Sequence, residues 1–110
     1  MKQYMNAKNR FYIEPFKVER VLENGQIWVR EMRYKLDRKT GEGTVGEPER
    51  GMGSYGKLLL TKHEDGHYFS KTNPLYKSYK FEFADEPKVW ADAHHLALVD
   101  YYRSRGILLD

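Results

Sequence analysis

Few residues in this chain could do chemistry, and their spacing limits what that chemistry could be. The 110-residue sequence contains no cysteine, which excludes a disulfide framework, thiolate metal sites and thiol catalysis. Its four histidines fall into two pairs, His63 with His67 and His94 with His95. Adjacent residues on a helix diverge by about 100°, so His94 and His95 cannot readily hold one ion together. None of the serines lies in a nucleophile elbow, the strained turn that exposes a catalytic hydroxyl.

The remaining pair, His63 and His67, would need to converge to hold a metal ion. An Asp65-Gly66 hairpin turn would place His63 opposite Tyr68, so the two histidines would be offset and need not face the same way. We therefore expect solvated turn residues and no metal site. A weak site that includes the neighbouring carboxylates is the alternative.

Residues Gly41–Gly46 match the G-x-G-x-x-G spacing of phosphate-binding loops. A dinucleotide-binding turn needs a helix directly after the glycines, whereas Glu47 and Pro48 follow here. A kinase-type loop needs a catalytic lobe, which a chain of 110 residues cannot contain. We therefore expect residues 38–56 to form a glycine-rich mobile loop, either a binding arm or a disordered linker, and not a catalytic phosphate site.

Carboxylates offer no better case for catalysis. Glu47 and Glu49 lie in the same glycine-rich stretch, where solvation keeps a carboxyl group ordinary. With no preorganised acid and base and no nucleophile, the sequence predicts a protein that is not an enzyme and that needs no cofactor.

The first element expected to position these residues is a β-hairpin. Its arms are residues 16–22 and 27–36, both rich in β-branched and aromatic side chains. Asn24-Gly25 between them favours a two-residue type I′ turn, because both residues tolerate positive φ. That register would put Glu19 opposite Arg30 as a complementary cross-strand pair.

A second hairpin is predicted from residues 57–62 and 68–71, and a half-buried strand from residues 76–83. The last expected element is a helix over about residues 86–105, capped by Asp85. Its apolar stripe would cover the sheet through the residues spaced at helical intervals: Val89, Trp90, Ala93, Ala97 and Tyr101.

Further apolar residues on this helix lie outside the stripe: Leu96, Leu98, Val99 and Tyr102. We expect them to contact the N-terminal residues 11–13 and the tail at 107–109, with a homodimer or partner surface as the alternative. Taken together, the elements predict a single α+β domain over residues 1–110. It would be an antiparallel sheet or small, partly open barrel of four to five strands covered by one C-terminal α-helix.

The charge of the chain limits the kinds of partner that we expect it to bind. Nineteen Lys and Arg against sixteen Asp and Glu give a formal charge of +3, and the two signs are interleaved, whereas DNA-binding domains concentrate positive charge on one face. No apolar run is long enough to span a bilayer, so we expect a soluble, cytoplasmic protein with no membrane partner.

Basic residues interleaved with aromatic ones form the strongest candidate surface, because Lys and Arg neutralise phosphates while Tyr stacks on bases. A solvated strand face in a tyrosine-rich protein would look the same. The candidate residues for binding a partner or nucleic acid are Arg33, Lys35, Arg38, Lys39, Arg50, Tyr55, Lys57, Lys80 and Tyr102.

The favoured function is a small non-enzymatic binding module, an adaptor, inhibitor or accessory protein, that acts through a protein–protein interface. One alternative is a nucleic-acid-binding protein that uses the basic and aromatic strand face and a flexible glycine-rich arm. A second is a small ligand- or nucleotide-binding domain. Short, cysteine-free, charge-rich chains are also typical of accessory proteins from phages or mobile elements, which is an association and not a physical argument.

Overall fold

The computed structural model describes residues 2–51 and 56–106. Within these ranges the chain forms eight strands, one short 3₁₀ helix and one α-helix, all bounded as follows. The elements are β1 (Tyr4–Lys8), β2 (Tyr12–Val21), β3 (Ile27–Leu36), β4 (Gly43–Pro48), β5 (Lys57–Lys62), β6 (Tyr68–Ser70), η1 (Pro74–Tyr76), β7 (Lys80–Ala84), β8 (Trp90–Ala91) and α1 (Ala93–Ser104).

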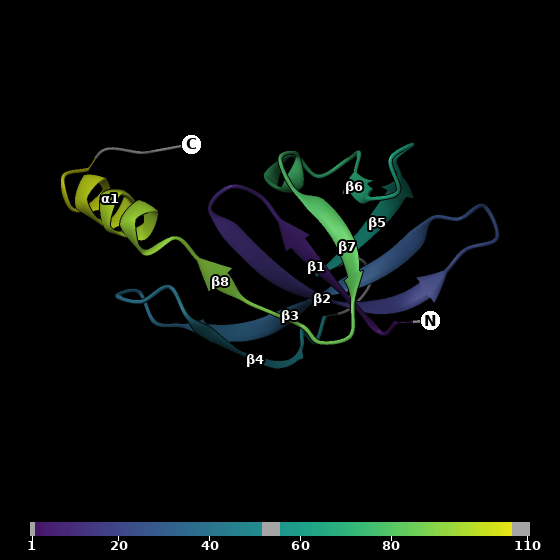
Figure 1. The fold of residues 1–110 in the computed structure, drawn as a ribbon, viewed down its shortest axis with the longest axis horizontal. Helices are drawn as coiled ribbons and strands as arrows, with labels where there is room; N and C mark the ends of the chain where they lie inside the picture. Colours follow the sequence, from purple (N-terminus) through teal and green to yellow (C-terminus); the bar gives the residue numbers. More distant parts are fainter. Residues whose placement is uncertain (1, 52–55, 107–110) are drawn as a thin grey trace.

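Six of the described strands close into an antiparallel barrel. The strand order is β4-β3-β5-β6-β7-β1-β2-β8, and an additional pairing of β3 with β2 joins the ring. Strands β4 and β8 lie outside the ring, against β3 and β2 respectively (Figure 1). Closure removes the exposed sheet edges that a flat sheet would present to other chains.

The predicted α+β class, with antiparallel hairpins and one C-terminal helix over the sheet, is confirmed. The expected four to five strands in a partly open barrel are only roughly right, because β1, β4 and β8 carry little sequence signal. Three consecutive residues of β1 are buried, so it shows no alternation, β4 is glycine-rich, and β8 has two residues. The predicted strand at residues 76–83 starts later, since Pro74–Tyr76 form η1.

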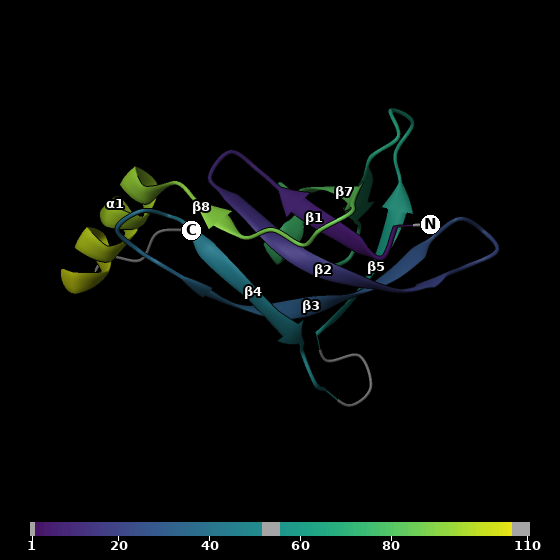
Figure 2. The same cartoon turned by 60° about the horizontal axis from the view of Figure 1, so that its bottom comes forward.

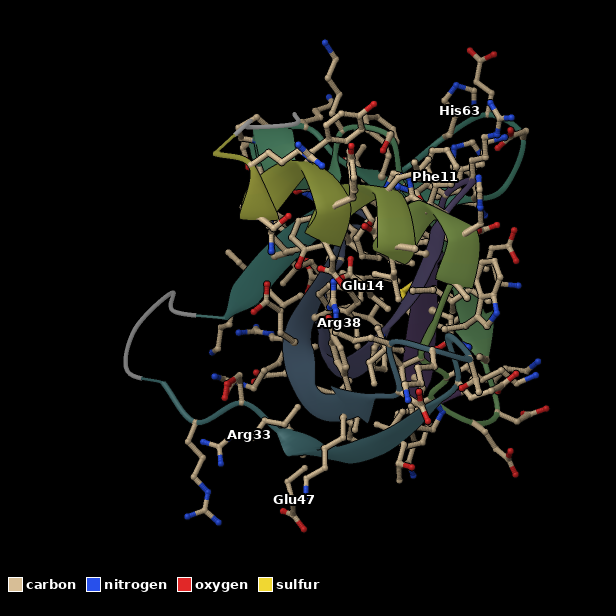
Figure 3. The ribbon with its side chains drawn as sticks, turned by 90° about the vertical axis from the view of Figure 1, so that its left-hand side faces the viewer. Phe11, Glu14, Arg33, Arg38, Glu47 and His63 are labelled. Carbon is tan, nitrogen blue, oxygen red and sulfur yellow. The ribbon has the colours of Figure 1, made fainter. Side chains whose placement is uncertain are left out.

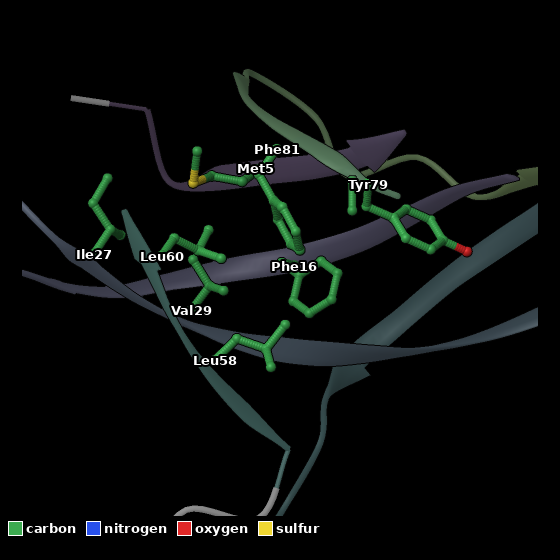
Figure 4. Close-up of a cluster of buried hydrophobic side chains, with 9 residues drawn as sticks. Met5, Phe16, Ile27, Val29, Leu58, Leu60, Tyr79 and Phe81 are labelled. Carbon is green, nitrogen blue, oxygen red and sulfur yellow. The ribbon is translucent and has the colours of Figure 1, made fainter. Parts of the chain in front are cut away.

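A mostly apolar core fills the barrel (Figure 4). Its buried residues come from β1, β2, β3, β5 and β7 and the segment before β7: Met5, Ala7, Phe16, Ile27, Val29, Leu58, Leu60, Tyr79 and Phe81. Phe16 and Phe81 are at most 1% exposed and pack edge to face, with ring centroids 5.1 Å apart. Such aromatic pairs are typical of well-packed cores.

The register of the β2–β3 hairpin differs from the type I′ expectation. Val21, and not Leu22, pairs with Ile27. A type I′ turn needs two residues with positive φ, but in this turn only Gly25 has one, at +88°. The loop therefore contains three residues, and a bulge at Glu19 shifts the register by one more residue. Lys17, and not Glu19, is thus the residue opposite Arg30, although the Glu19 carboxylate still contacts Arg30.

Part of the stretch expected to be a loop is a strand, since residues 43–48 form β4 against β3 (Figure 2). Gly41, the first glycine of the G-x-G-x-x-G string, has a φ of +77° and lies against β8. The amide of Ala91 donates to the Gly41 carbonyl at 2.9 Å, and a Cβ on Gly41 would lie 1.9 Å from the Ala91 oxygen. This glycine therefore permits close approach of two backbones.

The helix begins at Ala93 and not near residue 86, because residues 90–91 pair with β2 instead. Asp92 is its N-cap and accepts a hydrogen bond from the His95 amide at 2.9 Å. The predicted stripe is also wrong, since Leu96 is the buried residue of α1 and Tyr101 is 51% exposed. Among the described residues, no helix is long and apolar enough to cross a membrane.

Candidate functional site

One end of the barrel interior is polar. Side chains from β2, β3 and the segment before β7 meet there and form what we call the tyrosine–glutamate cluster: Tyr12, Glu14, Glu31, Tyr34, Tyr76 and Tyr79. Residues two apart on a strand point to the same face, so β2 directs Glu14 to the side of the buried Phe16. A carboxylate is thereby placed where the barrel core ends.

Tyrosine hydroxyls lie beside both carboxylates of the cluster. Tyr76 donates to Glu31 at 2.8 Å. Tyr79 and Tyr34 lie close enough to Glu14 to lower the pKa of its carboxyl group. Buried polar groups need such partners, because leaving one unpaired costs roughly 1–3 kcal/mol.

Burial raises the pKa of Glu14, and the negative charge of Glu31 raises it further, although the hydrogen bonds from Tyr79 and Tyr34 oppose this. Burial and the charge of Glu14 likewise raise the pKa of Tyr76 and of Tyr79, so both phenols stay protonated. Glu14 is therefore a poorly solvated carboxylate with tyrosine hydroxyls beside it.

A cavity of about 240 Å³ opens beside this carboxylate, between β2, β3, β8 and α1. The residues that line it are mostly aromatic or aliphatic, and they also include Glu14 and two arginines: Tyr12, Ile13, Glu14, Tyr34, Leu36, Arg38, Tyr79, Val89, Trp90, Ala91, Leu96, Val99 and Arg103. Figure 3 shows Glu14 and Arg38 below the helix, with His63 well away from them. We call this cavity the Glu14 pocket.

Helix α1 is held over the Glu14 pocket by three kinds of contact. The His95 ring stacks on Phe11 with centroids 3.9 Å apart, so the helix does contact residue 11, but through a residue outside the set expected to make this contact. Leu96 is buried. Arg38 donates from two nitrogens to Asp100, at 2.6 and 2.9 Å. The positive charge of Arg38 at the pocket is thus largely engaged by the helix.

Three of the candidate basic residues predicted from sequence are paired with carboxylates. Besides Arg38, Arg33 pairs with Glu49 at 2.7 Å, and Lys57 with Glu19 at 3.6 Å. Such pairs leave less positive charge for a phosphate backbone.

The other candidates are dispersed. Lys35 on β3, Lys39 and Arg50 in the flanking segments and Lys80 on β7 are all exposed, whereas Tyr102 is half-buried on α1. Tyr55 lies outside the described residues. Of the nine candidates, Arg38 is the one among the described residues that lines the Glu14 pocket.

The turn at residues 63–67 differs from the prediction. Lys62, and not His63, pairs with Tyr68, and the His63 amide donates to the His67 carbonyl at 2.8 Å. The two imidazoles are therefore not offset, and they stack with centroids 4.8 Å apart. The error has the same cause as in the first hairpin, since Gly66 alone in this turn has a positive φ, at +100°, and the loop contains three residues.

The sequence reasoning missed both glutamates of the polar end, although a signal existed. Tyr12, Glu14, Phe16 and Val18 lie two residues apart and so share one face of a strand, and three of the four are aromatic or aliphatic. Glu31 continues the face of the buried Ile27 and Val29. An acidic residue in an inward series indicates a buried carboxylate.

No known protein family, curated protein or solved structure matches this chain. The function must therefore be argued from the geometry. The Glu14 pocket combines a poorly solvated negative charge with aromatic ring faces, and both attract cations. Among the described residues, the His63, Asp65 and His67 cluster offers a second, separate set of ligand atoms.

Proposed function

We propose that the protein is a small non-enzymatic binding module that takes up a basic side chain, an arginine or a lysine, of a partner protein in the Glu14 pocket. The observation that carries this proposal is the half-buried Glu14 carboxylate in the wall of this pocket, with Tyr34, Tyr79 and a second carboxylate, Glu31, beside it. A bound cation would offset both the desolvation of Glu14 and its repulsion by Glu31, because an opposite charge favours the ionised form.

Pocket size and lining support a single side chain. The cavity of about 240 Å³ is smaller than the roughly 300–1,000 Å³ of pockets that enclose a drug-sized ligand. Tyr12, Tyr34 and Trp90 supply aromatic surface for an aliphatic stem and a cationic head. Tyr34 is 44% exposed and stands at the mouth, and the exposed Leu98 on α1 adds apolar surface for a partner.

The ion pairs of Arg33, Arg38 and Lys57 reduce the support for the nucleic-acid alternative. Arg38 and Arg103 also line the Glu14 pocket. Asp100 interacts with both arginines, since both lower its pKa. The net positive charge that an incoming basic side chain meets is therefore small.

The test is calorimetric titration of the full chain with blocked peptides of the form Gly-Arg-Gly and Gly-Lys-Gly, with Gly-citrulline-Gly as the uncharged control. We expect the basic peptides to bind more tightly than citrulline and E14Q to weaken them by at least about tenfold, because a charge-assisted bond is lost. The variant E47Q changes an exposed glutamate on β4 and should have no effect. Equal binding of arginine and citrulline peptides, or binding of oligonucleotides alone, would overturn the proposal.

A further inference from the structure

Two hairpin turns of this protein have the same design. Residues 22–26 read Leu-Glu-Asn-Gly-Gln and residues 63–67 read His-Glu-Asp-Gly-His. In both, the first amide donates to the fifth carbonyl at 2.8 Å and the glycine amide donates to the first carbonyl at 3.0 Å. The glycines have φ values of +88° and +100°. The backbone is thus the same, and the two turns differ in the side chains at the first, third and fifth positions.

This backbone brings those three side chains together. The first and fifth residues lie directly opposite each other, so their side chains emerge side by side. The third residue turns its side chain back to the fifth amide, at 2.9 Å for Asn24 and 3.1 Å for Asp65. In the second turn the result is a carboxylate held beside two imidazoles.

The distances suit a metal ion. One oxygen of Asp65 contacts Nδ1 of His67 and lies 3.3 Å from Nδ1 of His63. The imidazoles are nearly parallel, at 10°, and the ligand atoms all lie within 4.8 Å of one another. Bonds of about 2.0–2.2 Å around a tetrahedral zinc ion separate its ligand atoms by roughly 3.3–3.5 Å, so small side-chain rotations suffice.

The ligand atoms are also available. Nδ1 of His63 accepts from the Asp65 amide at 3.3 Å, a long bond, so this nitrogen carries a lone pair that faces the turn. Asp65 supplies a carboxylate oxygen at the surface, beside both imidazoles. About half of the surface of His63 and Asp65 is exposed, so an ion can reach them from solvent.

We propose that His63, Asp65 and His67 form a binding site for a divalent transition-metal ion such as Zn²⁺ or Cu²⁺, with the remaining coordination positions filled by water. Imidazole with one carboxylate suits these ions, whereas Mg²⁺ and Ca²⁺ prefer oxygen ligands throughout. The site lies at the tip of the β5–β6 hairpin, away from Glu14 (Figure 3). It is therefore independent of the Glu14 pocket.

The chain supplies its own control. The triple variant H63L/D65N/H67Q converts the second turn into the sequence of the first and so keeps a turn that this fold already forms. The test is isothermal titration of the untagged, chelator-treated full chain with ZnCl₂ and CuCl₂. We expect one ion per chain for the wild type, tighter binding of Cu²⁺ than of Zn²⁺, and at least a hundredfold loss in the triple variant with unchanged circular dichroism.

The reciprocal variant L22H/N24D/Q26H builds the same side chains on the first turn, and we expect it to bind a second ion. Nitrogen NMR of the imidazole rings should shift Nδ1 of His63 and His67, the atoms that face Asp65. Equal Zn²⁺ affinity of the wild type and the H63L/D65N/H67Q variant would overturn the proposal, as would Mg²⁺ displacing Zn²⁺ at equal concentration.

Discussion

The two ends of the barrel interior contrast sharply. At one end Met5, Ile27, Val29 and Leu60 are at most 1% exposed and touch apolar neighbours. Towards the other end, the buried side chains continue through Phe16 to Tyr79, whose hydroxyl points away from the apolar side chains (Figure 4). The polar end holds carboxylates and phenols, and the Glu14 pocket opens beside them.

We infer from this contrast that the residues that stabilise the barrel are separate from those proposed to bind a partner. Burial of aliphatic groups stabilises a fold at roughly 25 cal/mol per Å², so the apolar end should hold most of the stability. A buried carboxylate contributes little to stability, because desolvation opposes it. Polar groups retained in such a place suggest a binding role, and the following predictions are ordered by the size of the expected effect.

The largest effect is expected at the apolar end. Leu60 on β5 is fully buried and pairs with Ile27 on β3. The substitution L60A should therefore lower the free energy of unfolding by about 3 kcal/mol, because it removes buried apolar surface and leaves a cavity. Urea denaturation followed by circular dichroism measures this. A loss as small as that of a surface substitution would show that the apolar end does not hold the fold together.

The next largest loss of stability is expected for a substitution at Gly41, because the backbone of this residue packs closely against that of Ala91. G41A would force both a disfavoured φ and a contact with Ala91, whereas G25A meets nothing within 4 Å and adds strain alone. We expect losses of about 2–3 kcal/mol for G41A and about 1 kcal/mol for G25A. Denaturation of the matched pair isolates the contribution of backbone packing, and equal losses would contradict it.

Substitution of Glu14 should raise the free energy of unfolding, whereas the two preceding substitutions lower it. Its pKa in the folded protein is raised above the ordinary value of 4.5, so the folded state binds more protons than the unfolded state between the two pKa values. The associated stability is present below the unfolded pKa and is lost as the pH rises through the folded one. E14Q should therefore gain on the order of 1 kcal/mol at pH 7 and lose this pH dependence.

Unfolding experiments on the wild type and E14Q between pH 4 and 8 test this, with E47Q as the exposed control. The curves of the wild type and E47Q should run parallel, and that of E14Q should diverge above pH 4.5. A parallel E14Q curve would mean that Glu14 is as well solvated as Glu47.

The smallest effect is expected for the pair that fastens the helix. Arg38 and Asp100 make two short hydrogen bonds, but both side chains are about half exposed, so a double-mutant cycle of R38A and D100A should give only a small favourable coupling energy. Raising the salt concentration should reduce it. Zero coupling would leave Phe11, His95 and Leu96 to hold α1.

Several features were predictable because they depend on local patterns. Tyr79, Phe81 and Phe83 alternate, and their face was assigned correctly from residues 76–83. Both hairpins were located from Asn24-Gly25 and Asp65-Gly66, but their turn types were not, because a glycine after Asn or Asp is compatible with two loop lengths. That one-residue difference decides whether His63 and His67 meet.

Composition and short-range periodicity are enough to predict the fold class, the two hairpins, the C-terminal helix and the lack of thiol chemistry. They do not predict the closed barrel, the pairing of residues 90–91 with β2 or the proximity of Glu14 to Glu31. Those features depend on pairings between residues far apart in the chain. Local patterns cannot specify them, because each strand satisfies its hydrogen bonds with whichever distant neighbour the closed barrel provides.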